Sequence, residues 1–365
     1  MEKPRIPQDK LINHSKFKAF TQWVHKHHLA LALVVSAAVV AIIFIIAMYS
    51  VQSDSGSPFF AGTKKPKEKF YSSLTGLEVA DANAVKAPVT GVIVENSPNA
   101  RPQSGLSKAG IVYEAVAEGG ITRFFALYQG NKPAKIGPVR SLRLYYLQWS
   151  TPYKASIFHV GGSANALSTV RNGKYHDIDE FSNGNSYWRA NDRRAPHNAY
   201  TSGEKIDQTN TAKGHTESVF TGFKRADDKP AETPNATQIA INFSGPLFNT
   251  NYTYNKESNT YARTLAGQPH NDAEAGQIAP NSIVALEVNV EHRPGSREGY
   301  EDVTTVGTGK AYIFQNGVVA QATWKRDNEN AELKLVDAAG KDIALNRGQT
   351  WIAAFTPGRG SIAWQ

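Results

Sequence analysis

Two arginines follow a Gly-Pro turn near the middle of the chain, in the segment GPVRSLR at 137–143. The start of a helix leaves backbone N–H groups without partners and carries a partial positive charge, so a turn that enters a helix can hold an anion. The planar guanidinium group of arginine binds phosphate or carboxylate through two hydrogen bonds. Arg140, Ser141 and Arg143 are therefore predicted to bind an anionic ligand.

A second turn of this kind follows the apolar run at 156–160. It contains His159, Gly161, Gly162 and Ser163, and Ser163 is a suitable N-cap for the apolar helical pattern that comes next. If the strands before the two turns are neighbours, both turns emerge at one edge of the sheet and converge. These four residues are predicted to complete the anion site, although His159 could instead be an ordinary core histidine.

Further ligand-binding candidates lie around these turns. Arg123 interrupts an apolar run, and Arg193, His197 and Asn198 belong to the polar segment RRAPHN. Residues 121–197 contain eleven Lys and Arg against four Asp and Glu, and this local excess of positive charge suits an anionic ligand.

Several of these candidates also have a purely structural interpretation. Arg123 could form a salt bridge with Glu114 or Glu118 in the same sheet. The segment with His197 and Asn198 could simply be a turn whose side chains bond the backbone. His270 and Asp272, which are ligand-like residues two positions apart on a predicted loop, are also more typical of a turn.

No established catalytic signature accompanies these residues, because the sequence lacks GxSxG, HExxH and Walker motifs. A nucleophile at Ser141 or Ser163 with His159 or His197 as its base lacks an indicated third member. A metal site is not indicated, because the four possible ligands lack the spacing of a zinc site: His159, Asp177, Asp179 and His197. Neither a metal nor a cofactor is predicted, the catalytic residues are unknown, and whether the chain is an enzyme stays open.

An α/β domain at 88–232 is predicted to position the site. Strands are expected in apolar runs bounded by turn residues, at 88–96, 110–117, 121–128 and 156–160. A helix is expected between Pro138 and Thr151, because four residues share one helical face: Leu142, Tyr145, Tyr146 and Trp149. Since no helix separates the first three strands, the sheet should be mixed. The polar stretch 201–232 is predicted to be irregular.

A β-rich antiparallel domain is predicted for 233–365. It contains strand patterns separated by Gly, Asn and Asp turns, at 237–243, 259–265, 282–290, 311–316, 317–324, 331–336 and 350–356. No segment in this half has a helical periodicity long enough to predict a helix.

An uncharged apolar run at 29–51 is long enough to cross a bilayer as a helix. Lys and Arg concentrate in the tail at 1–28, so the positive-inside rule places this tail in the cytoplasm. The Ser-, Gly- and Lys-rich stretch 52–87 is predicted to be a linker. The expected protein is a single-pass plasma-membrane protein with its folded domains outside, and a cleaved signal peptide is the alternative.

The charge and the absence of cysteine limit the possible functions. The formal net charge is +8, which favours acidic partners such as lipid headgroups or wall polymers. Because the sequence contains no cysteine, it can form neither a disulfide nor a thiolate metal site, and it offers no thiol nucleophile and no cysteine for lipidation. Nucleic acid is not expected as a partner, because the predicted location is outside the cell and no basic helix with interleaved aromatics is present.

Several longer motifs resemble the YerB-like family of bacterial envelope lipoproteins. The first half carries them in ENSPNARPQSGLSKAGIVYEAVAEGGITRFFALY, KIGPVRSLRLYY, FHVGGSANAL and RRAPHNAYTS, and the second half in PHNDAEAGQ, GTGKAYIFQNG, TWKR and LNRGQTWIAAF. The similarity spans roughly residues 88–357. It implies a two-part extracytoplasmic module, a domain of unknown function without an established activity. Lipoproteins of this family are tethered through a cysteine, so here the apolar helix would have to tether the chain.

The leading functional hypothesis is a membrane-anchored module that binds an anionic envelope component, either a lipid-linked phosphate or a peptidoglycan carboxylate. One alternative is an envelope glycopolymer transferase or hydrolase that acts on such a ligand, with His159 or His197 as acid or base. Another is a scaffold that recruits envelope protein partners.

Overall fold

The computed structural model describes residues 14–51, 68–293, 295 and 299–365. The first of its two units contains α1 (His14–Val51), a helix of 38 residues. This helix includes the apolar run 29–51 and also the more polar residues before it. In the part of the chain that the structure describes, no helix combines the length and apolar character required to cross a membrane. The predicted transmembrane span is therefore not supported.

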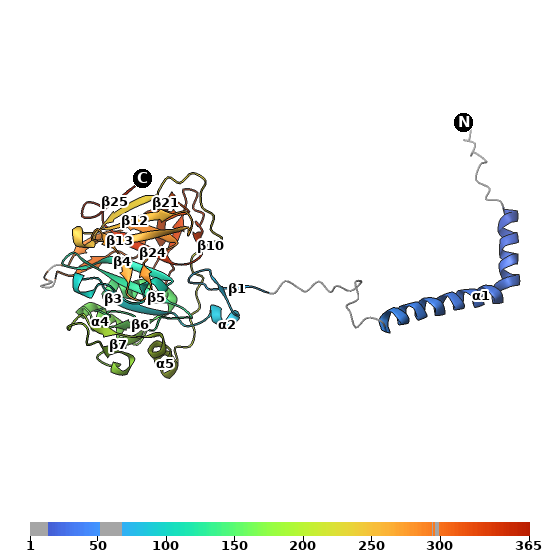
Figure 1. Cartoon of the computed structure of the whole chain (residues 1–365), viewed down its shortest axis with the longest axis horizontal. Helices are drawn as coiled ribbons and strands as arrows, with labels where there is room; N and C mark the ends of the chain where they lie inside the picture. The colour runs from blue at the N-terminus through green and yellow to red at the C-terminus, as the bar shows by residue number, and fades with distance from the viewer. Residues whose placement is uncertain (1–13, 52–67, 294, 296–298) are drawn as a thin grey trace, which may run out of the picture. The chain divides into compact units, whose positions relative to one another are not determined.

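The second unit, Lys69–Gln365, is built on a ten-stranded mixed sheet (Figure 1). Its strand order is β22-β21-β20-β17-β24-β4-β5-β3-β6-β7. In this order the strands are Lys334–Val336, Val318–Arg326, Gly307–Gln315, Ser282–Glu287, Thr350–Phe355, Ile111–Glu118, Ile121–Tyr128, Thr90–Glu95, Ser156–His159 and His176–Asp179. The mixed α/β prediction for the first half is confirmed.

Strand β24 joins the two halves of the sequence, since it pairs in parallel with β17 on one side and with β4 on the other. One sheet therefore runs through residues that were predicted to belong to two domains. The boundary at residue 232 stays a prediction. The parallel pairing also means that the C-terminal half is only partly antiparallel.

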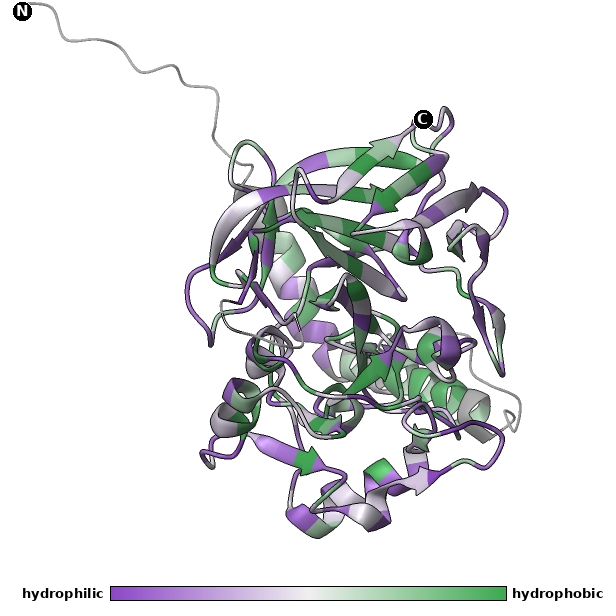
Figure 2. Ribbon diagram, turned by 90° about the vertical axis from the view of Figure 1, so that its left-hand side faces the viewer, coloured by the Kyte–Doolittle hydropathy of each residue, from purple (hydrophilic) through white to green (hydrophobic). Residues whose placement is uncertain are grey.

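A five-stranded antiparallel sheet packs on one face of the large sheet, in the order β14-β13-β12-β11-β25. Its strands, in that order, are Gln268–Pro269, Thr260–Leu265, Thr250–Asn255, Gln238–Asn242 and Ser361–Trp364. Figure 2 shows hydrophobic segments alternating with neutral and hydrophilic ones along the strands of this region, and many connecting loops in hydrophilic colours. Three of these strands, β12, β14 and β25, were not predicted.

The remaining strands form two-stranded pairs. They are β1 (Phe70–Tyr71) with β2 (Glu78–Val79), β8 (Trp188–Arg189) with β9 (Ala199–Tyr200), β10 (Arg225–Ala226) with β23 (Leu345–Asn346), β15 (Asn271–Asp272) with β16 (Gly276–Gln277), and β18 (Val290–His292) with β19 (Glu301–Val303). Short 3-10 helices are η1 (Pro98–Ala100), η2 (Leu106–Lys108), η3 (Thr151–Tyr153), η4 (Gly184–Ser186) and η5 (Pro246–Phe248).

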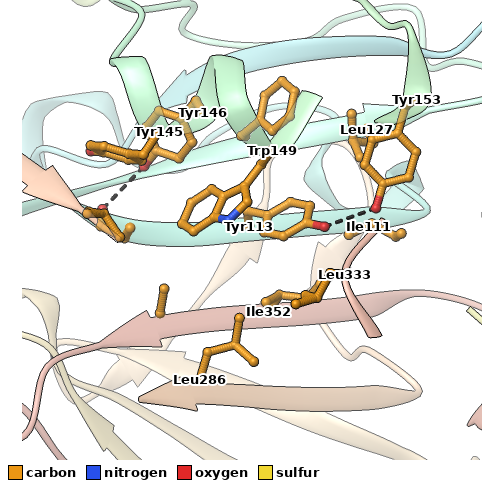
Figure 3. Packing of buried hydrophobic residues seen from close by; sticks show 14 of the residues in the cluster. Ile111, Tyr113, Leu127, Tyr145, Tyr146, Trp149, Tyr153, Leu286, Leu333 and Ile352 are labelled. Carbon is orange, nitrogen blue, oxygen red and sulfur yellow. Dashed lines mark hydrogen bonds between the residues drawn. The ribbon is translucent and has the colours of Figure 1, made fainter. Parts of the chain in front are cut away.

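The opposite face of the large sheet is covered by α3 (Leu144–Ser150) and α4 (Ala164–Val170). Side chains alternate along each strand, so Phe125 of β5 packs on the α3 side while Phe124 faces the second sheet. Figure 3 shows Tyr145, Tyr146 and Trp149 of α3 above the sheet. This aromatic layer holds the helix on the strands that carry the predicted site.

Two segments differ from the sequence prediction. Residues 203–213, predicted to be irregular, form α5 (Gly203–Lys213). Only Gly203, Ile206 and Asn210 of this helix are buried, so its apolar periodicity is too weak to reveal it. Part of the predicted linker is folded as well, as β1, β2 and α2 (Ala82–Val85). Its anchor is Leu74, which is buried in the core on the α3 side.

Candidate functional site

The two predicted turns lie side by side, as the sequence suggested. Leu142 N–H donates to the Gly161 carbonyl at 3.0 Å, and Ser163 N–H donates to the Leu142 carbonyl at 3.1 Å. Val160 N–H also donates to the carbonyl of Arg140, at 3.0 Å. The segment with the arginines therefore runs along the segment with His159 to Ser163.

Arg123 and Arg143 converge on one carboxylate, that of Glu118. Arg123 donates to Glu118 Oε1 and to the Ser141 carbonyl, while Arg143 donates to Glu118 Oε2 from Nη2 at 2.7 Å. Burial raises the pKa of the Glu118 carboxyl, but the two guanidinium groups hold it below its usual value. Both arginines are buried and also contact backbone carbonyls, so their donors serve mainly internal partners.

Arg140 and His197 meet at a different carboxylate, that of Glu95. His197 Nδ1 donates to Glu95 Oε1 at 2.9 Å, Ser97 Oγ donates to the same oxygen at 2.8 Å, and Arg140 Nε forms an ion pair with it at 3.3 Å. The Glu95 side chain is 4% exposed, whereas those of Arg140 and His197 are 25% and 20% exposed. We call Glu95, Ser97, Arg140 and His197 the Glu95 cluster.

Two side chains of the Glu95 cluster have outer nitrogens that make no hydrogen bond within the part of the chain that the structure describes. Neither terminal nitrogen of Arg140 hydrogen-bonds a described residue, and the same is true of His197 Nε2. Glu95 pairs with the other end of each side chain, through a hydrogen bond with His197 Nδ1 and through an ion pair with Arg140 Nε that is not a hydrogen bond. Both side chains are partly exposed to solvent. Two cationic or hydrogen-bonding groups above a buried carboxylate can receive an anion.

His159 is fully buried and both of its ring nitrogens have partners. Nδ1 lies 2.8 Å from the Gly161 carbonyl and Nε2 lies 2.8 Å from Asp177 Oδ1. A carbonyl only accepts, so Nδ1 carries a proton. His159 therefore orients the turn and Asp177, and it does not face an open cavity.

The backbone donors assigned to a ligand at the second turn are also engaged. Gly161 N–H donates to Asp179 Oδ1 at 2.9 Å, and the Ser163 hydroxyl donates to Asn165 Oδ1 at 2.7 Å. Gly162 forms a bridge with Leu142, and a Cβ at Gly162 would lie 3.0 Å from the Leu142 carbonyl oxygen. Glycine thus permits the close approach of these two segments, and a ligand role for this turn stays a prediction.

The two remaining candidates, Arg193 and Asn198, form hydrogen bonds with other parts of the same folded unit. Arg193 donates to the Pro102 carbonyl at 2.7 Å. Asn198 accepts from Arg189 at 3.2 Å and donates to the Ala190 carbonyl at 3.1 Å. These bonds hold the segment that carries His197, and neither residue shares a partner with Arg140.

A buried polar network between the two sheets was missed in the sequence. Glu114 Oε2 accepts from Arg263 at 2.8 Å and from Trp351 at 2.9 Å, and all three side chains are buried. Arg263 also donates to Nδ1 of His270, whose Nε2 donates to Gln103 at 2.9 Å. Burial, with help from nearby arginines, lowers the pKa of His270 well below its usual value. The only sequence signal was a charged residue inside each of two otherwise strand-like runs.

His270 and Asp272 therefore have structural partners, as expected for a turn, since Asp272 accepts from the backbone N–H of Ser107 at 2.9 Å. Throughout the described ranges, no group of three or more His, Cys, Asp or Glu side chains is arranged to hold a metal ion.

Comparisons with known proteins cover both halves of the chain. Residues 74–216 match the N-terminal domain, and residues 239–352 the C-terminal domain, of a family described as "Protein of unknown function (DUF3048)". A protein of Bacillus subtilis (strain 168) named "Putative lipoprotein YerB" is 34% identical over 291 residues, which are 78% of this chain and 86% of that protein. The crystal structure of YerB from Bacillus subtilis is similar with a TM-score of 0.71 and 30% identity, over 81% of this chain and 100% of the solved one.

Proposed function

Because the chain belongs to the DUF3048 family, to which its two matched domains and its similarity to YerB assign it, we propose that it is a binding module of the cell envelope. Its folded unit lies outside the cytoplasm and binds an anionic envelope component, either a lipid-linked phosphate or a peptidoglycan carboxylate. The activity of the family is unknown, so the ligand class rests on the residues of this chain.

The observation that carries the proposal is the geometry of the Glu95 cluster. The buried Glu95 carboxylate accepts a hydrogen bond from His197 Nδ1 and forms an ion pair with Arg140 Nε, and the outer ends of both side chains have no hydrogen-bond partner among the described residues. Such an arrangement pre-organises the donors, so binding an anion costs little side-chain entropy. Arg140 and His197 contact the ligand, while Arg123 and Arg143 act through Glu118 to hold the segment 140–143 in place.

Membrane attachment is the second part of the proposal, and we assign it to α1. Several apolar side chains in this helix are exposed: Val39, Val40, Ile42, Ile43, Phe44, Ile45, Ile46 and Met48. A continuous apolar surface of this kind associates with lipid. After carbonate extraction the full chain should stay with the membrane fraction, and a chain without residues 14–51 should be released; retention of both would refute this assignment.

The binding proposal is tested with the full chain in detergent and its Arg140→Gln variant, titrated by calorimetry with pyrophosphate, a short polyprenyl phosphate and peptidoglycan fragments. Loss of one charge-assisted contact should weaken binding by roughly tenfold or more. Arg347→Gln is the matched control, because the Arg347 side chain is also 25% exposed and pairs with one carboxylate, Asp227.

Binding by the parent and the control but not by Arg140→Gln, with all three folded by circular dichroism, is the expected result. If the parent binds none of the three probes, or Arg140→Gln binds them as the parent does, the Glu95 cluster is not the anion site.

One observation favours an enzyme as the second candidate. His197 is hydrogen-bonded through Nδ1 to a buried carboxylate, which is the arrangement that orients a histidine for general acid or base chemistry at Nε2. A transferase or hydrolase of envelope glycopolymers would then lose turnover in His197→Gln while its ligand affinity is retained. A pure binding module shows no turnover with any ligand that it binds.

A further inference from the structure

A polar groove lies between α5 and the loop that follows β7, and no residue of the Glu95 cluster lines it. Figure 1 shows α5 and β7 at the same end of the folded unit. The volume of the groove is about 460 Å³. One wall is the loop 182–186, which includes η4, and the other wall is α5. The helix contributes residues at i, i+3, i+4, i+7 and i+8, which form one continuous face: Lys205, Gln208, Thr209, Ala212 and Lys213.

The two walls are fixed to each other. The hydroxyl groups of Ser186 and Thr209 are hydrogen-bonded at 2.7 Å, and Lys205 Nζ donates to the Asn185 carbonyl at 2.8 Å. On the far side of α5, Ile206 is buried in the core. The groove is therefore a formed feature of the fold, and Ala212 on its helical wall leaves room for a ligand.

The lining is rich in amide and hydroxyl groups and contains two lysines but no carboxylate. Several of its polar atoms make no hydrogen bond to any residue in the described ranges. They are the side-chain amide of Asn185, Oδ1 of Asn183, Oε1 of Gln208 and Nζ of Lys213. Acceptors, amide donors and a cation are thus available along one groove.

We propose that this groove is a glycan-binding site. A sugar hydroxyl both donates and accepts, so neighbouring hydroxyls match the paired carbonyl and NH₂ groups of Asn and Gln. Among the described residues, no large apolar side chain lines the groove to receive an apolar ligand, and a bare phosphate would leave the amides unused. The lysines suit a glycan that also carries carboxylate groups.

Phe181 directly precedes Ser182 of the groove, although its ring lies near Gly161 and does not line the groove. Its side chain is 77% exposed, the highest value among the exposed large hydrophobic residues of the described chain. The C–H face of a sugar ring can stack on an exposed aromatic ring, so Phe181 can contact a sugar unit that extends beyond the groove.

The site is tested on the full chain in a zwitterionic detergent, because a sugar-based detergent would compete. The probes are cellotetraose, chitotetraose and a tetramer of galacturonic acid, titrated by calorimetry. The double variant Asn185→Ala with Gln208→Ala should weaken binding roughly tenfold or more, through two lost hydrogen bonds. The matched control replaces two exposed amides on other strands, Gln268→Ala in β14 with Gln321→Ala in β21.

Lys213→Gln should weaken only the acidic tetramer, which separates recognition of the carboxylates from recognition of the sugar hydroxyls. Arg140→Gln should leave the affinity for the two neutral tetramers unchanged, because they carry no anion for Arg140 to bind, so the anion site and the glycan site can fail independently. The glycan site is refuted if the parent binds none of the three tetramers, or if the double variant binds them as tightly as the control does.

Discussion

Three carboxylates pair with four arginines of the folded unit. Glu118 pairs with Arg123 and Arg143, Glu95 with the partly exposed Arg140, and Glu114 with Arg263. Taking a charge out of water is costly unless a partner compensates it, and the buried Arg326 is compensated by backbone carbonyls instead of a carboxylate. Arg140 differs from the others because its partner contacts only Nε, and this difference makes it the ligand-binding arginine of the proposal.

Replacing Glu118 with Gln should destabilise the fold by about 3 kcal/mol at pH 7, because two buried guanidinium groups lose their shared counter-charge. Urea unfolding measures this value. The Glu118 pKa is lower in the folded state than in the unfolded chain, so its contribution is present at neutral pH and is lost as the pH falls from about 4.5 through the folded pKa. Glu118→Gln should lack this acid-dependent part.

Glu78→Gln is the control for that experiment, because Glu78 forms an exposed salt bridge with Lys69 and its loss should change stability little. An equal effect of the two substitutions would show that Glu118 does not compensate the buried arginines.

The secondary-structure elements place these residues through local rules. Gly119 and Gly120 have positive φ angles and form the two-residue turn between β4 and β5, which brings Glu118 next to Arg123. Helix α5 begins at Ser202, whose hydroxyl accepts from Lys205 N–H at 3.1 Å, and it ends at Gly214 with a φ of 72°. These two caps stabilise the ends of the helix, in a segment whose apolar periodicity is weak.

Ser202→Ala should destabilise the protein by about 1 kcal/mol, since the N-terminal N–H groups of α5 lose their side-chain acceptor. Thermal or urea unfolding measures the change. Ser168 is a matched control because it is exposed within α4, and Ser168→Ala should be neutral or slightly stabilising. If both variants have the same stability, the Ser202 hydroxyl does not cap the helix in solution.

At the scale of the folded unit, the two family domains share a sheet and a core. Strand β24 lies between β17 and β4, and the Glu114–Arg263 pair links the large sheet to the five-stranded sheet. Both faces of β4 are buried, so neither matched domain has its own closed core. We therefore expect Lys69–Gln365 to unfold as one cooperative unit.

Arg263→Met should lower the stability of the whole folded unit by about 3 kcal/mol or more, because it leaves Glu114 buried without its partner. Native-state hydrogen exchange should report an equal loss in β5 of the first half and in β20 of the second. Lys334→Met, at an exposed position of β22, should leave both unchanged. Faster exchange confined to β20 would mean that the halves are independent.

Much of the fold and part of the site could be predicted from local sequence patterns. Apolar alternation between turn residues located β3, β4, β5, β6 and β24 within a residue or two, because each pattern is complete within one strand. The two turns at 137–143 and 159–163 meet as expected, but not for the expected reason, because β3 lies between the strands β5 and β6 that precede them. The apolar run 29–51 predicted a helix there, though the structure does not support a membrane span.

The partners of the charged residues were decided by the tertiary structure alone. Glu95 lies opposite Arg123 in the β3–β5 register, yet it holds Arg140 and His197, while Arg123 turns to Glu118. Which charged side chains pair depends on how strands and loops distant in sequence pack together, and on which carboxylates that packing shields from solvent. The joining of the two halves through β24 and the groove beside α5 arise in the same way, because no local pattern records which element will lie beside which.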